Sequence, residues 1–226
     1  MSPALRLAHR GDWRRAPENT IAAFRAALAV PGCDGLEFDV RAARNGIPVV
    51  IHDETLDRVQ RVAGRVGTMT TDELNRHGVP TLEQVLFSLP RRAFLDVELK
   101  GDPGRGAVDA LTAGRGPGLE RAIISSFEPD TLRRVARLAP AWPIWLNAMD
   151  LSPRTIELAV AIGCRAVSVD WHTIDARSMA AARDAGLEVA AWTVRRRATY
   201  RRLARLGVVA ICAEAGALDD GAEPPA

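Results

Sequence analysis

Two apolar segments of the chain carry acidic side chains at every second position. Glu37 and Asp39 alternate with apolar residues in Gly35–Val40, and Asp96 and Glu98 do so in the segment that ends at Lys100. Alternate residues of a β-strand share one face, so we expect these charged side chains to point into the interior of a sheet or barrel. Buried carboxylates are costly unless they are paired or bind a cation. The pattern indicates either a site for a hard divalent cation, with oxygen ligands, or a buried network of ion pairs.

The four histidines differ in their predicted positions. His9 ends the first predicted strand and His52 follows another, so both fall where strands of a barrel open into an active site. Two imidazoles that converge on a carboxylate cluster are typical of an acid/base pair, because imidazole titrates near neutral pH. His172 also follows a strand and is a weaker candidate for the pocket wall, whereas His77 lies in a polar turn where we expect it to be solvated.

Lysine is nearly absent from this arginine-rich chain. Of the 30 lysine and arginine residues, only Lys100 is a lysine, and it lies on the same strand face as Asp96 and Glu98. A compact ammonium differs from the planar guanidinium in how it binds anions, so this position is a candidate anion-binding residue. Codon bias with one chance lysine is the alternative explanation.

Strand patterns alternate with helical patterns along most of the chain, which favours a parallel sheet with right-handed crossovers. Eight such units predict an α/β fold of the (β/α)₈ TIM-barrel class. A doubly wound open sheet is the alternative, although no glycine-rich phosphate loop follows the first strand. Helix starts are indicated at Thr81, Pro129 and Ser152-Pro153. The predicted barrel strands are Leu5–Ala8, Gly35–Val40, Ala93–Leu99, Ala122–Ser126, Pro143–Asn147, Ala166–Asp170, Glu188–Thr193 and Val208–Cys212.

A ninth predicted strand, Ile47–Ile51, follows the second too closely for a parallel crossover, which needs a dozen or more residues. The intervening Asn45-Gly46 is a strong hairpin signal. We therefore expect the second strand to turn back as an antiparallel hairpin. The hairpin would return His52 to a place opposite Phe38 and Asp39.

Bulk composition restricts the class of protein. The 226 residues carry a net charge of +2 and no long basic run, so a nucleic-acid partner is not indicated. No apolar run reaches the ~18 residues that a membrane helix needs. Three cysteines (Cys33, Cys164 and Cys212) lie in or beside strands and favour a reducing, cytoplasmic location. We expect a single barrel domain over residues 1–216 and a disordered polar tail over 217–226. The oligomeric state is not indicated.

An ordered set of motifs spans most of the chain and resembles the glycerophosphodiester phosphodiesterase family. Each motif alone is short, but their order along the chain is specific. The short segment between His52 and Pro80 resembles a compact member with a reduced insertion over the site. The motifs are His9-Arg10-Gly11, Pro17-Glu18-Asn19-Thr20, Glu37-Phe38-Asp39-Val40, His52-Asp53, Pro80-Thr81-Leu82, Glu98-Leu99-Lys100, Ser126-Phe127 and Trp192-Thr193-Val194.

The resemblance implies a TIM barrel that hydrolyses glycerophosphodiesters, small-molecule substrates, to glycerol 3-phosphate and an alcohol. It implies one divalent cation (Ca²⁺ or Mg²⁺, with Mn²⁺ a further candidate) bound by Glu37, Asp39 and Glu98. His9 and His52 would be the acid/base pair, and Arg10 and Lys100 would hold the phosphate. Phe127 and Trp192 would form an apolar wall beside the glycerol or the leaving group, with core packing as the alternative. For Glu18 and Asn19, at the start of the first helix, we expect a capping role.

Two positions depart from the family pattern. Arg195 stands where members often have asparagine, and Ala213-Glu214-Ala215 replaces a Thr-Asp pair before a proline. Both lie in loops on the substrate side and bear on headgroup preference. Two alternative functions therefore stay open: a lysophospholipase D-like or phospholipase C-like enzyme acting on lipids, and a non-catalytic barrel that binds a phosphorylated metabolite. The nucleophile is either water or the glycerol 2-hydroxyl.

Overall fold

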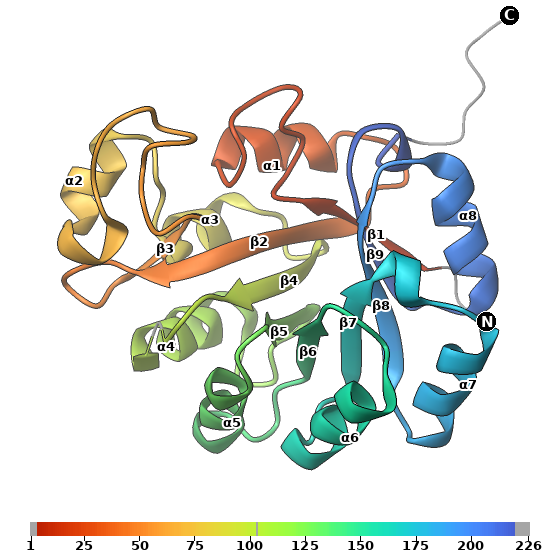
Figure 1. Ribbon diagram of the computed structural model, residues 1–226. Coiled ribbons are helices and arrows are strands. Elements are labelled where there is room, and N and C mark those ends of the chain that lie inside the picture. The colour runs from red at the N-terminus through yellow and green to blue at the C-terminus, as the bar shows by residue number, and fades with distance from the viewer. Residues whose placement is uncertain (1–3, 103, 220–226) are drawn as a thin grey trace, which may run out of the picture.

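Eight parallel strands close into a barrel in the computed structural model, which describes residues 4–102 and 104–219 (Figure 1). Strand β1 pairs with both β2 and β9, so the ring of eight strands is closed and the predicted TIM barrel is confirmed over the doubly wound alternative. The barrel strands are β1 (Leu5–His9), β2 (Gly35–Ala42), β4 (Phe94–Leu99), β5 (Ala122–Ser126), β6 (Ile144–Ala148), β7 (Ala166–Asp170), β8 (Glu188–Val194) and β9 (Ala210–Ala213).

Helices connect the strands, and their ends follow local sequence signals. Thr81 and Gln84 form a capping box at the predicted start of α3, and Ser152 caps α6 ahead of Pro153. Gly163 and Gly207 close their helices in the left-handed conformation, with φ of 84° and 92°. The helices are α1 (Ile21–Leu28), α2 (Thr71–Arg76), α3 (Leu82–Ser88), α4 (Gly104–Arg115), α5 (Pro129–Leu138), α6 (Pro153–Ile162), α7 (Ala176–Asp184) and α8 (Arg197–Leu206).

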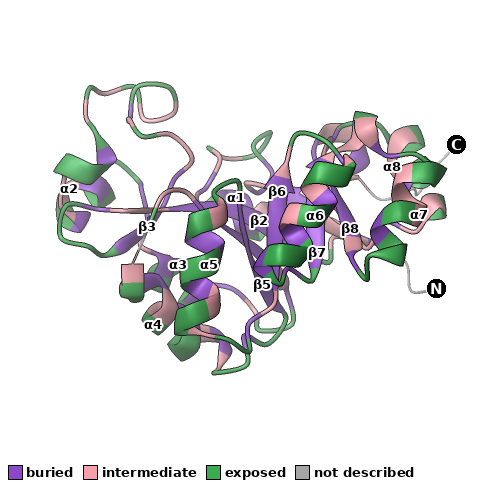
Figure 2. Cartoon of the chain, turned by 60° about the horizontal axis from the view of Figure 1, so that its bottom comes forward, coloured by how far each residue is buried: buried purple, intermediate pink, exposed green. Residues whose placement is uncertain are grey.

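Apolar side chains pack on both faces of the barrel strands, outside and inside the barrel. The outward side chains of the barrel, such as Leu36, Phe38 and Val97, pack against the buried faces of the helices, whose other faces are exposed (Figure 2). A second apolar cluster lies inside the barrel, at the end where the strands begin. This cluster comprises Leu7, Ile123, Trp145, Ala166, Ala190 and Ala210. The carboxyl ends of the strands therefore remain available for polar side chains.

Strand β2 continues beyond the barrel and pairs antiparallel with β3 (Pro48–Val50), with Val40 opposite Val50. The segment that follows carries α2 and packs on a small core of its own, at the left of Figure 1. This core comprises Ala43, Val49, Ile51, Leu56, Val66, Leu74 and Val79. The Ile51 N–H donates to the Asp39 carbonyl oxygen at 2.9 Å, which brings the next residue, His52, beside the end of β2.

The packing extends past the expected boundary at residue 216. Ala217 and Leu218 are buried, and Asp219 forms an ion pair with Arg14 at 2.9 Å. Residues 217–219 are therefore packed against the barrel, and residue 217 was too early a start for the expected disordered tail. The rest of that expected tail, residues 220–226, lies outside the described residues. Among the described residues, no helix is long and apolar enough to cross a membrane.

A close backbone approach between β2 and β4 requires glycine at position 35. A Cβ atom there would lie 2.0 Å from the Phe94 carbonyl oxygen, inside the pair of strands that carries the acidic residues. We predict that Gly35→Ala lowers the free energy of unfolding by about 3 kcal/mol, because the two strands must separate. Chemical denaturation measures this change. Gly118→Ala, where a Cβ atom meets nothing within 4 Å, is the control, and equal stability of the two variants would contradict the prediction.

Candidate active site

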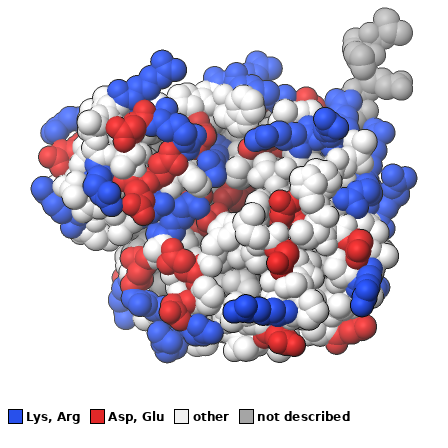
Figure 3. Space-filling view, in the orientation of Figure 1, with Lys and Arg blue, Asp and Glu red and all other residues white. Residues whose placement is uncertain are grey.

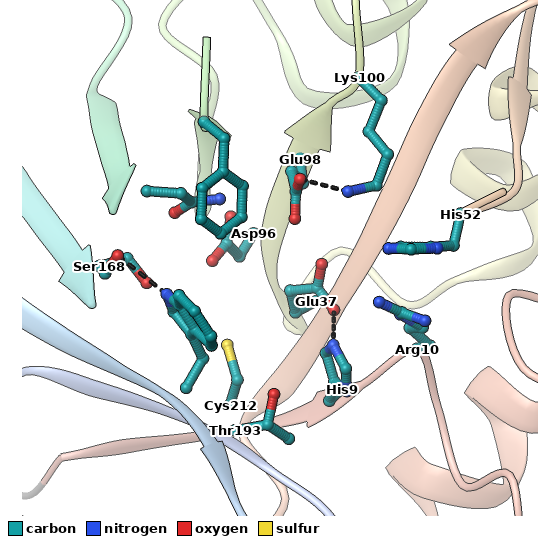
Figure 4. A pocket seen from close by; sticks show the side chains of 13 residues that line it. His9, Arg10, Glu37, His52, Asp96, Glu98, Lys100, Ser168, Thr193 and Cys212 are labelled. Carbon is teal, nitrogen blue, oxygen red and sulfur yellow. Dashed lines mark hydrogen bonds and ion pairs between the residues drawn. The ribbon is translucent and has the colours of Figure 1, made fainter. Parts of the chain in front are cut away.

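A cavity of about 220 Å³ opens at the carboxyl end of the barrel. Its lining residues come from β1, β2, β4 and the segment after β3 on one side, and from β6 to β9 and the loop after β5 on the other (Figure 4). The residues that line it are His9, Arg10, Glu37, His52, Asp96, Glu98, Lys100, Phe127, Asn147, Ser168, Trp192, Thr193 and Cys212. Viewed from outside, acidic atoms lie in the hollow at the centre of the face that Figure 3 shows.

Strand register brings the acidic residues together. In the parallel pairing of β2 with β4, Glu37 lies beside Asp96, and Asp39 beside Glu98. One oxygen from each of Glu37, Asp39 and Glu98 lies within 4.8 Å of the others, and all three residues are buried. Burial raises the pKa of Glu37 well above its usual value, and the neighbouring carboxylates raise it further. The pKa of Glu98 is also raised, by burial and by Asp39.

Two cations offset part of this charge. The Lys100 ammonium lies 2.5 Å from Glu98 Oε1 and 3.2 Å from Asp39 Oδ1. Arg10 Nε lies 3.1 Å from Asp39 Oδ2. Although burial alone would raise the pKa of Asp39, Arg10 and Lys100 hold it below its usual value. The network of ion pairs considered from the sequence thus exists, but it is incomplete: Glu37 Oε2 is buried without a hydrogen bond among the described residues.

Asn19 contacts the acidic cluster, so the capping role expected for Glu18 and Asn19 is wrong. Thr20 is the residue whose side chain caps α1. Asn19 has a φ of 58°, which turns its amide toward β2, and its Nδ2 donates to Asp39 Oδ2 at 2.9 Å. Glu18 instead accepts hydrogen bonds from Arg10 at 3.1 Å and from Arg58 at 2.6 Å. The Pro17-Glu18-Asn19-Thr20 sequence also matches a helix start, so the sequence alone did not indicate the contact between Asn19 and Asp39.

His52 is held by a carboxylate and an arginine. Its Nδ1 lies 2.6 Å from Asp53 Oδ1, and Arg58 Nε donates to Asp53 Oδ2 at 2.6 Å. Burial lowers the pKa of His52, although Asp39 acts in the opposite direction. For Asp53, the hydrogen bonds from Arg58 and His52 outweigh burial and lower the pKa to about 2. Among the described residues, nothing hydrogen-bonds to Nε2 of His52, so this ring nitrogen is available to a ligand.

His9 reaches the cluster from the end of β1. Its Nε2 lies 3.7 Å from Glu37 Oε2, and its Nδ1 lies 2.5 Å from Glu214 Oε1. Glu214 follows β9, and Arg195, after β8, donates to its other oxygen at 2.8 Å. Burial would raise the pKa of Glu214, but the contacts with His9 and Arg195 lower it to about 2. Sequence reasoning noted the unusual segment around Glu214 without assigning it this contact.

The far wall of the cavity combines two aromatic rings with polar groups. Phe127 and Trp192 meet edge to face, with ring centroids 5.5 Å apart, and both line the cavity. Trp192 Nε1 donates to the Ser168 carbonyl oxygen at 2.9 Å, which fixes the indole ring. Asn147, which the sequence analysis did not single out, is buried here, and its Oδ1 has no hydrogen-bond partner among the described residues.

The other two histidines do not line this cavity. His172 is exposed and stacks on Trp171, with its Nδ1 2.6 Å from Asp170 Oδ1. His77 lies at the C-terminus of α2 and is exposed, as expected. Only His9 and His52 therefore belong to the site.

Known proteins are similar to this chain over most of its length. Residues 9–215 match the model of the glycerophosphoryl diester phosphodiesterase family. The chain belongs to this family. A glycerophosphodiester phosphodiesterase of Caldanaerobacter subterraneus is 31% identical, and the match covers 89% of this chain and 90% of that protein. This member of the family is accordingly an enzyme, a phosphoric diester hydrolase, rather than a non-catalytic binding barrel.

Solved structures share the fold. The glycerophosphodiester phosphodiesterase of Agrobacterium tumefaciens is 29% identical, with a TM-score of 0.80 over 95% of this chain and 98% of that one. An Oleispira antarctica phosphodiesterase, solved in complex with the product sn-glycerol-3-phosphate, is 23% identical, with a TM-score of 0.81 and 93% of each chain covered. The second likeness supports the fold alone.

The amide of Asn19 should stabilise the buried Asp39 carboxylate. We predict that Asn19→Gly, which tolerates the positive φ, lowers the free energy of unfolding by about 1–3 kcal/mol because Asp39 loses a donor. Arg61→Gly is the matched control, since Arg61 also has a positive φ (57°) but is exposed. Denaturant titration of both variants measures the difference. Equal losses would mean that the Asn19 amide contributes nothing beyond its backbone conformation.

Proposed function

We propose that this enzyme hydrolyses glycerophosphodiesters to glycerol 3-phosphate and an alcohol, with one divalent cation and with His9 and His52 as the acid/base pair. One observation carries the proposal: two imidazoles, each with Nδ1 engaged by a carboxylate, flank a buried cluster of three further carboxylates. Such a cluster is costly to bury without a cation.

The donor set suits a hard cation. Glu37, Asp39 and Glu98 offer only carboxylate oxygens, which Ca²⁺, Mg²⁺ and Mn²⁺ prefer. Burial raises the pKa of Glu37 and of Glu98, and repulsion from neighbouring carboxylates, Asp39 in both cases, raises them further; a bound cation would relieve both effects. Glu37 Oε2 also makes no hydrogen bond among the described residues, which leaves it available as a ligand. When bound, the cation would neutralise charge on the phosphate oxygens and polarise the phosphorus centre.

The imidazoles would transfer the protons. One of His9 and His52 would take a proton from the nucleophile, either water or the glycerol 2-hydroxyl, and the other would donate a proton to the leaving alcohol. Asp53 and Glu214 engage the Nδ1 atoms, so the Nε2 atoms are the ones available to the substrate. Burial lowers the pKa of His52 and so favours its neutral form, which suits the role of the base.

The remaining cavity residues would bind the two ends of the substrate. Arg10 and Lys100 are cations at the edge of the acidic cluster, and they would hold the phosphate as fixed charges. Phe127 and Trp192 form the opposite wall and would contact the glycerol or the leaving group. With this division, the phosphate would lie over β1, β2 and β4.

A lipid substrate is the second candidate. Phe127 is 42% exposed at the mouth of the cavity, so its ring could contact an acyl chain that extends out of the site. This observation favours a lysophospholipase D-like reaction in addition to the hydrolysis of water-soluble diesters.

Release of glycerol 3-phosphate from glycerophosphocholine tests the proposal. We expect activity that EDTA abolishes and that Ca²⁺, Mg²⁺ or Mn²⁺ restores. His9→Ala and His52→Ala should each lower kcat on the order of 10²–10⁴-fold, because each removes a proton-transfer group. His77→Ala, at an exposed histidine outside the cavity, is the control.

Activity that survives EDTA, or histidine variants that match the wild type, would contradict the mechanism. Lysophosphatidylcholine run in parallel decides between substrates. Faster turnover of the lipid, together with its loss in Phe127→Ala, would favour the second candidate.

A further inference from the structure

The contact between His9 and Glu214 joins the first and last strands of the barrel. His9 ends β1, and Glu214 directly follows β9, which pairs with β1 with Ala8 opposite Ala213. The Glu214 side chain is 7% exposed and lies 2.5 Å from His9 Nδ1. A buried carboxylate in this position sets both the direction of the ring and which nitrogen carries the proton.

We propose that Glu214, held in place by Arg195, is a positioning residue that orients His9 for the reaction. This inference rests on the proposed function, since it assumes that His9 transfers a proton. Glu214 does not line the cavity, so it acts through His9 rather than on the substrate.

Each oxygen of Glu214 has its own partner. Oε1 faces His9, and Oε2 accepts a hydrogen bond from Arg195 Nε at 2.8 Å. The backbone is fixed as well, because the Glu214 N–H donates to the Val194 carbonyl oxygen at 2.9 Å. With both oxygens and the backbone engaged, the carboxylate has little freedom to rotate away from the imidazole.

The geometry assigns the ring nitrogens. A carboxylate accepts hydrogen bonds, so Oε1 favours the tautomer with the proton on Nδ1. Nε2 then carries a lone pair on the side of the cavity, 3.7 Å from Glu37 Oε2. Figure 4 shows the ring directed at Glu37. Without Glu214, the ring could rotate or exchange its proton between the two nitrogens.

Arg195 and the segment Ala213–Ala215 are the two departures from the family pattern, and Arg195 contacts Glu214 within that segment. Because Arg195 forms an ion pair with Glu214 and Glu214 contacts His9, the two departures act together on His9. The same order of groups occurs at the other imidazole, where Asp53 faces His52 Nδ1 and Arg58 donates to Asp53. Each imidazole is thus supported by a carboxylate that an arginine holds.

Steady-state kinetics of Glu214→Ala, Glu214→Gln and Arg195→Ala test the inference. Because Glu214 touches no substrate, we expect Glu214→Ala to lower kcat on the order of 10–100-fold, with KM within about twofold of the wild type. Glu214→Gln should retain more activity, since its carbonyl oxygen can still accept from Nδ1. Arg195→Ala should show a smaller loss, because it loosens Glu214 without removing it.

The ¹⁵N signals of the imidazoles provide a readout that a purely structural role would not change. The chain has four histidines, so His9→Ala assigns the His9 signals in histidine-labelled protein. We expect protonated Nδ1 in the wild type and a shift toward protonated Nε2 in Glu214→Ala. Glu188→Ala is the control, since Glu188 accepts from Arg165 Nε at 2.9 Å on the neighbouring strand, away from this cavity.

Two outcomes would overturn the inference: wild-type kcat in folded Glu214→Ala, or an unchanged His9 tautomer. If Glu214→Ala fails to fold, folded Arg195→Ala replaces it, and wild-type kcat in that variant would overturn the inference. A wild-type enzyme that is inactive on glycerophosphodiesters would refute the proposed function, whereas the ¹⁵N measurement would still test the contact between Glu214 and His9.

Discussion

The arrangement of the site depends on one electrostatic constraint, the burial of several carboxylates at one end of a closed barrel. The pairing of β2 with β4 sets Glu37 beside Asp96 and Asp39 beside Glu98. In a medium of low dielectric constant, this repulsion is much stronger than in water. Lys100, Arg10 and Asn19 offset it at Asp39 and Glu98. Glu37, whose pKa burial raises well above its usual value, keeps one oxygen without a hydrogen bond within the described part of the chain.

The rest of the fold makes this burial tolerable. An apolar cluster lies at the opposite end of the barrel, and helices cover the outer face of the strands. Folding therefore gains hydrophobic burial that the polar end does not supply. The hairpin of β2 and β3 returns the chain to the rim and delivers His52. The network of Arg58 with Glu18 and Asp53 then ties this excursion to the β1–α1 loop. The buried carboxylates are thus gathered at the end of the barrel where the cavity opens to a ligand.

Short-range patterns predicted most of the architecture, because alternation and helix caps are local properties. Alternation of apolar and polar residues alone predicted the eight strands and the common face of Glu37 and Asp39. The number of strands predicted that they close into a barrel. The contacts of Asn19 and Glu214 did not follow. Asn19 occurs in a sequence that also fits a helix start, and its positive φ has no sequence signal. Glu214 is 205 residues from His9 and becomes its neighbour only when β9 closes the barrel against β1.

The central claim is that Glu37, Asp39 and Glu98 together bind a cation beside two imidazoles. A crystal structure of the enzyme soaked with Mn²⁺ and glycerol 3-phosphate, with anomalous data, tests it most directly. We predict one anomalous peak among these three carboxylates at metal–oxygen distances of about 2.0–2.6 Å, with the product phosphate near Arg10 and Lys100. An absent peak at saturating Mn²⁺, with Lys100 still paired to Glu98, would contradict the account and favour a closed network of ion pairs.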